Sequence, residues 1–123
     1  MNTYLLAAAL LSILIGIIHS ILGEMLIFKK LRNNALVPTL GASPLNKSNI
    51  RIIWATWHLA SILGFAIGAI LINLANEKVL DSFIINSVSW AMMASSILVC
   101  YATKGKHPGW FGLLLVSLLC FLA

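Results

Sequence analysis

Four apolar stretches separated by short polar linkers fill almost the whole chain of 123 residues. They cover about residues 3–28, 52–75, 83–102 and 108–123. A helix that crosses the hydrocarbon core of a bilayer needs roughly 20 apolar residues, so the first three stretches are long enough and the fourth is short. The pattern predicts an all-α membrane protein, a single domain built as an antiparallel bundle of four transmembrane helices, with a loop over about residues 29–51.

Composition leads to the same class. The chain is 61% hydrophobic and 9% charged, whereas an ordinary soluble domain has about 25% charged residues. A soluble protein of this length has too small an interior to bury so much apolar surface. The lipid bilayer is therefore the expected surrounding of the chain.

The distribution of the basic residues predicts the topology. Lys78 lies in the second linker beside two acidic residues, and the other basic residues lie in or beside the first and third linkers. These are Lys29, Lys30, Arg32, Lys47, Arg51, Lys104 and Lys106. The positive-inside rule places the first and third linkers in the cytoplasm and both termini in the periplasm of a bacterial inner membrane. The net charge of +5 is thus explained by topology, and no nucleic-acid partner is expected.

Small residues recur at four-residue spacing on the first two predicted helices. Ser12, Gly16 and Ser20 share one helical face, and so do Ala60, Gly64 and Gly68. Small residues allow helix backbones to approach closely in lipid. The two faces are expected either to pack against each other within the chain or to form the seam of a homodimer.

Ionisable groups inside the apolar stretches mark a candidate site. His19 lies ~13 Å from the cytoplasmic end of the first helix, and His58 lies ~10 Å inside the second. Glu24 and Arg51 lie nearer the same boundary. These similar depths predict one polar cluster in the cytoplasmic half, between the first and second helices. The candidate ligand-binding residues are His19, Glu24, Arg51, Trp54, His58, Lys106 and His107.

The same residues also admit a structural interpretation. An ion pair between Glu24 and Arg51 would join the two helices, because charged groups within a membrane face the bundle interior and pair with each other. Each buried imidazole needs a hydrogen-bond partner, which Ser20, Ser61 or Ser96 could provide.

The cluster favours a ligand-binding function. An anionic or amphiphilic small molecule, such as a lipid headgroup or a metabolite, would be held by the Arg51 guanidinium through two parallel hydrogen bonds, with the histidines as further donors. Transport of this ligand would be an extension of binding. Proton-coupled transport is a related hypothesis, since glutamate and histidine side chains carry protons in membrane transporters.

Two alternative hypotheses are a metal centre and a purely structural role. His19 and His58 on neighbouring helices are the minimal ligand pair for a haem b or another metal centre. The chain would otherwise be a non-catalytic structural or assembly subunit of a membrane complex. It has neither the zinc-protease HExxH motif nor a glycine-rich phosphate loop, and the sequence offers no basis for an enzymatic activity.

Overall fold

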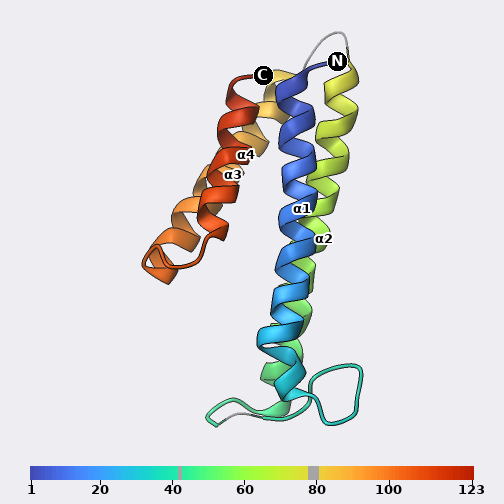
Figure 1. Ribbon diagram of the computed structural model, residues 1–123, viewed down its shortest axis with the longest axis vertical. Coiled ribbons are helices and arrows are strands. Elements are labelled where there is room, and N and C mark those ends of the chain that lie inside the picture. The colour runs from blue at the N-terminus through green and yellow to red at the C-terminus, as the bar shows by residue number, and fades with distance from the viewer. Residues whose placement is uncertain (42, 78–80) are drawn as a thin grey trace. The chain divides into compact units, whose positions relative to one another are not determined.

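The computed structural model describes residues 1–41, 43–77 and 81–123 (Figure 1). Within these residues all regular structure is helical, as the apolar pattern predicts. The four α-helices are α1 (Thr3–Leu26), α2 (Lys47–Asn76), α3 (Ser82–Thr103) and α4 (Gly109–Phe121), and a short 3-10 helix, η1 (Phe28–Leu31), follows α1. Lys78, one of the residues used to predict the topology, lies outside the described residues.

Three of the described helices are long and apolar enough to cross a bilayer: α1, α2 and the Ser82–Tyr101 part of α3. The fourth, α4, has 13 residues, which corresponds to about 20 Å of helix. This is shorter than the ~30 Å hydrocarbon core. The expectation that the fourth apolar stretch is short is therefore met.

The second helix starts earlier than the hydrophobic pattern indicates. It begins at Lys47 instead of about residue 52, because two asparagines close its first turn. The Asn49 backbone N–H donates to Asn46 Oδ1 at 3.0 Å, and the Asn46 backbone N–H donates to Asn49 Oδ1 at 3.2 Å. This reciprocal arrangement satisfies backbone donors that a helix start leaves unpaired. Arg51 consequently lies within α2.

The chain divides into two compact units. Unit 1 contains Met1–Ile15 and Gly64–Ala123, and unit 2 contains Gly16–Leu63. Because α1 and α2 run through both units, each unit contains an antiparallel pair of segments from these two helices. Unit 1 also contains all of α3 and α4.

Unit 1 holds the main apolar core. Its fully buried members include Leu5, Leu71 and Val116. Two serine hydroxyls connect α3 to α4, since Ser117 Oγ donates to the Ser89 carbonyl at 2.8 Å and Ser96 Oγ donates to the Trp110 carbonyl at 2.7 Å. These contacts are interhelical hydrogen bonds of the kind that hold helices together in lipid.

Part of the predicted faces of small residues, namely Ser12 on α1 and Gly64 and Gly68 on α2, packs between these helices in unit 1. Ser12 Oγ donates to the Gly64 carbonyl at 2.9 Å. A Cβ atom placed on Gly68 would come within 2.5 Å of Ile13 Cγ1, so glycine is what allows this approach. Packing within the chain thus uses these residues, whereas a homodimer seam through the same faces stays a prediction.

Candidate ligand-binding site around Glu24

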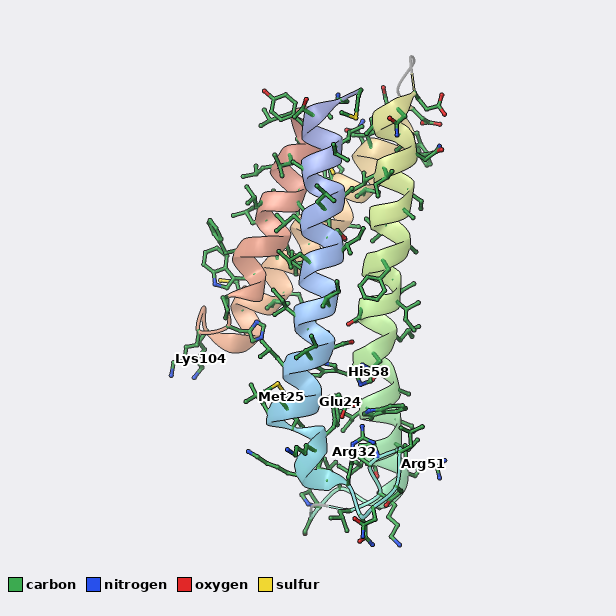
Figure 2. All side chains as sticks on the ribbon, turned by 45° about the vertical axis from the view of Figure 1, so that its right-hand side comes forward. Glu24, Met25, Arg32, Arg51, His58 and Lys104 are labelled. Carbon is green, nitrogen blue, oxygen red and sulfur yellow. The ribbon has the colours of Figure 1, made fainter. Side chains whose placement is uncertain are left out.

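The carboxylate of Glu24, near the end of α1, is the centre of a polar cluster in unit 2. Its Oε1 atom accepts a hydrogen bond from Trp54 Nε1 at 2.6 Å and lies 2.9 Å from His58 Nε2. Its Oε2 atom accepts a hydrogen bond from Arg32 Nη2 at 2.5 Å. Figure 2 shows Glu24, Arg32 and His58 pointing toward one another. Both carboxylate oxygens are therefore occupied by donors from the protein.

Three different segments bring these donors together. Trp54 and His58 are four residues apart on α2 and hence share one helical face. Arg32 follows η1, where the backbone becomes extended (φ −87°, ψ 138°), and this change of direction returns its guanidinium to Glu24. A second guanidinium nitrogen, Nη1, donates to the Ala35 carbonyl at 3.3 Å. The arginine is thus held by a non-helical segment.

His58 links the carboxylate to two serines. Its Nδ1 atom lies 2.9 Å from Ser20 Oγ, and Ser20 Oγ lies 2.8 Å from Ser61 Oγ. A neutral His58 that donates from Nε2 to Glu24 accepts the Ser20 proton at Nδ1, and Ser61 then donates to Ser20. A protonated His58 donates from both nitrogens, and Ser20 then donates to Ser61. The continuous hydrogen-bonded series Glu24–His58–Ser20–Ser61, which we call the relay, accommodates either protonation state.

Aromatic rings pack in the same unit. The His19 and Trp57 rings are stacked, with centroids 4.4 Å apart and an angle of 6° between their planes. Trp57 Nε1 donates to the His19 carbonyl at 3.0 Å. Phe28, which is fully buried, meets the Trp57 ring edge-on at 5.7 Å. A Cβ atom on Gly23 would lie 2.1 Å from Trp57 Nε1, so the position of the indole depends on the glycine.

The structure brings together three of the predicted site residues, Glu24, Trp54 and His58, but not the hypothetical ion pair of Glu24 with Arg51. Glu24 contacts both Trp54 and His58 and therefore lies level with the segment between them. Arg51 is about 4.5 Å nearer the start of α2 than Trp54, and it is exposed. Figure 2 shows it pointing away from Glu24. Arg32 takes the place that the sequence suggested for Arg51.

Lys106 and His107 belong to unit 1, in the connection between α3 and α4. Both are exposed. His107 Nδ1 accepts the backbone N–H of Gly109 at 3.1 Å, which satisfies a donor at the start of α4. The structure thus gives His107 a local role at a helix end.

The sequence pattern does not identify Arg32 as a site residue. It places the arginine in the basic linker that sets the topology, and the conformation of a linker follows from no periodic pattern. One signal points to it: Glu24 is the only acidic residue among residues 1–76, and the nearest basic residues follow it. A lone carboxylate at the end of a membrane helix is expected to attract such a neighbour.

The arrangement does not fit a bis-histidine haem. A metal centre with three or more His, Cys, Asp or Glu ligands is not found among the described residues, and a haem with two histidine ligands depends on the orientation of the rings. His58 uses both ring nitrogens, one toward Glu24 and the other toward Ser20. The His19 ring is stacked on Trp57. An iron ligand needs a ring nitrogen directed at the metal, and His58 offers none here.

Glu24, His58 and Ser20 also have the connectivity of an acid–base–nucleophile triad. Acyl transfer additionally needs donors for the developing oxyanion. Ser20 lies inside the continuous helix α1, where backbone N–H groups are already used by the helix. The arrangement is therefore more suited to holding charge and protons than to nucleophilic catalysis.

Comparison of the chain with protein-family models, with curated proteins and with solved structures gave no match.

Proposed function

We propose that this chain is a small bacterial inner-membrane protein that binds an amphiphilic cation at Glu24. In this proposal α1 to α4 form an antiparallel transmembrane bundle, the first and third linkers are cytoplasmic and both termini are periplasmic. The observation that carries the binding function is the Glu24 carboxylate, which is surrounded by donors and paired with a guanidinium from a non-helical segment.

The distribution of side chains supports a membrane location. Large apolar side chains on α1 are half-exposed, among them Leu10, Leu14 and Ile21. Hydroxyl groups are buried instead, as at Ser12 and Ser61. Exposed apolar surface of this extent is unfavourable in water, and buried hydroxyls that bond across helices are typical of membrane bundles.

The charge of the site supports a cationic ligand instead of the anion suggested by the sequence. An anion would need a free cationic clamp, but the cation in the cluster, Arg32, is already paired with Glu24. A carboxylate at this depth is costly unless it is paired with a positive charge. A ligand that displaces Arg32 must therefore carry a positive charge of its own.

The aromatic rings beside the carboxylate suit the apolar part of such a ligand. The Trp54 indole bonds directly to Glu24, and its ring meets His58 edge-on at 5.0 Å. Flat aromatic faces attract cations and cover apolar groups. An amphiphilic cation would thus combine the ion pair with apolar contact.

A ligand cation can replace the Arg32 guanidinium at Glu24 without disturbing the helices. It lies beyond the end of η1, and its long side chain can place the guanidinium in the headgroup region, where the charge is solvated. Trp54 and His58 would continue to hold Glu24 between α1 and α2. In this scheme Arg32 is an internal competitor that keeps the carboxylate paired between binding events.

The test is equilibrium binding of tetraphenylphosphonium and of an alkylguanidinium to the protein in lipid nanodiscs, read by quenching of tryptophan fluorescence. We expect Glu24→Gln to abolish binding and Arg32→Gln to strengthen it, because the internal competitor is removed. Lys29→Gln, which removes an equal charge from an exposed residue nearby, is the matched control. A folded wild-type protein without affinity for either cation would contradict the proposal and favour a structural role.

The relay supports a second candidate function, exchange of the cation for a proton. In this second function the cation would bind Glu24 beside Arg32 without displacing it. The added positive charge would destabilise a protonated His58 by like-charge repulsion, and the proton would leave through Ser20 or toward the aqueous linker. Release of protons on cation binding, followed with a pH indicator in weakly buffered solution, tests this function. We expect His58→Gln to bind the cation without releasing a proton, and proton release by this variant would contradict it.

A further inference from the structure

A second polar feature of unit 2 lies at the start of α2. An open hollow of about 490 Å³ is lined by Lys47, Ser48, Arg51, Ile52 and Ala55. All five residues are exposed. None of them contributes to the cluster around Glu24, so the hollow is a separate feature of this unit.

The hollow carries positive charge that the protein does not neutralise. Unit 2 contains the acid Glu24, which is paired with Arg32. Among the described residues, Lys47 and Arg51 have neither an ion pair nor a side-chain hydrogen bond. They are four residues apart on α2 and therefore lie on the same helical face. An anion that enters the hollow would meet both charges.

The lining changes from polar to apolar along the helix. Lys47, Ser48 and Arg51 are followed, toward the membrane-spanning part of α2, by Ile52 and Ala55. The distance from the first to the last of these residues is about 12 Å along the helix axis. A phospholipid has the same order of groups, with a phosphate at the surface and acyl chains below it.

We propose that this hollow binds the headgroup of an anionic phospholipid. The Arg51 guanidinium donates two parallel hydrogen bonds to the phosphate oxygens, Lys47 adds a second positive charge, and the Ser48 hydroxyl donates a further hydrogen bond. The acyl chains lie against Ile52 and Ala55. In the proposed topology this end of α2 faces the cytoplasmic leaflet, so the lipid belongs to that leaflet.

The test compares two double variants that remove the same charge. Wild type, Lys47→Gln/Arg51→Gln and Lys29→Gln/Lys30→Gln are exchanged into micelles with phosphatidylglycerol and phosphatidylcholine in equal amounts, and native mass spectrometry counts the bound lipids. Lys29 and Lys30 are exposed residues of the same unit outside the hollow. Each cation near the membrane surface contributes about fivefold to the affinity for an anionic lipid. We therefore expect the preference of the Lys47/Arg51 variant for phosphatidylglycerol to fall by about 25-fold. The Lys29/Lys30 variant should retain the wild-type preference.

Two further arms identify the source of the binding. Arg51→Lys keeps the charge but loses the paired hydrogen bonds, and we expect an intermediate preference. Equal losses in the two double variants would overturn the proposal in favour of non-specific surface charge. Displacement of the lipid by millimolar inorganic phosphate would overturn it in favour of a soluble anion.

Circular dichroism of each variant verifies the helical fold. Glu24→Gln should retain the lipid, which separates this site from the cation site.

Discussion

Glu24 Oε1 and His58 Nε2 lie 2.9 Å apart and connect α1 to α2 across 34 residues of sequence. Each group stabilises the other, because a partly buried carboxylate and a partly buried imidazole both need a polar partner. The contact thus contributes to helix packing and to the chemistry of the site together. Variants that separate the two contributions are the most informative experiments on this protein.

Replacement of Glu24 by glutamine should destabilise the protein. The amide is close in shape and can still accept from Trp54, but the charge that pairs with Arg32 is lost. Since the Glu24 side chain is 31% exposed, we expect a loss of about 1–3 kcal/mol in the free energy of unfolding, which is less than for a fully buried pair. Unfolding of detergent-solubilised protein by sodium dodecyl sulfate measures it. Glu77→Gln, at an exposed residue of unit 1, should have almost no effect.

Substitution of Gly23 by alanine should displace Trp57. The added Cβ would lie 2.1 Å from Trp57 Nε1, so the indole must move and its stacking on His19 is lost. Forcing an extra methyl group into a packed site costs about 1–3 kcal/mol. We expect a red-shifted tryptophan emission and a lower unfolding midpoint.

Gly64→Ala is the matched control for this change. The nearest atom to a Cβ on Gly64 is 3.7 Å away, an ordinary van der Waals contact. Alanine is also the better helix former by about 1 kcal/mol. We expect Gly64→Ala to leave the unfolding midpoint unchanged or to raise it, and equal destabilisation by both variants would contradict the assigned position of Trp57.

The sequence predicts the parts of this structure that follow from periodicity and depth. A membrane-spanning helix satisfies its own backbone groups and needs a fixed apolar length, so the spans are readable from hydropathy. The rise per residue also places His58 and Glu24 in the same half of the protein, although it matches His58 with His19 and Glu24 with Arg51. Neither argument specifies where a linker folds back. Arg32 reaches Glu24 because α1 ends at Leu26 and η1 redirects the chain, and the early start of α2 depends on the paired asparagines at residues 46 and 49.

Removal of the Ser20 hydroxyl should interrupt the relay while leaving the carboxylate site in place. Ser20→Ala deprives His58 Nδ1 and the Ser61 hydroxyl of their shared partner, and we expect a loss of about 1 kcal/mol of stability. The ¹⁵N chemical shifts of His58 should report a changed tautomer or protonation state, and cation-driven proton release should fall. Ser12→Ala is the control. It removes another hydroxyl of α1, which donates to the Gly64 carbonyl and has no contact with His58, and it should leave the His58 spectrum unchanged.

The two histidines should respond differently to replacement by phenylalanine. His19 offers a ring stacked on Trp57 at 4.4 Å, and phenylalanine preserves a ring at that position. His58 offers two hydrogen-bonding nitrogens, which phenylalanine lacks. We therefore expect His19→Phe to bind amphiphilic cations almost as well as wild type, and His58→Phe to lose both binding and stability. Because an aromatic pair contributes about 0.5–1.5 kcal/mol, His19→Ala should lower the free energy of unfolding by about that amount. Fluorescence titration measures the binding of the variants, and unfolding in sodium dodecyl sulfate measures their stability. Equal and complete loss on changing either histidine is the behaviour of a paired imidazole centre, and it would contradict the separate roles assigned here.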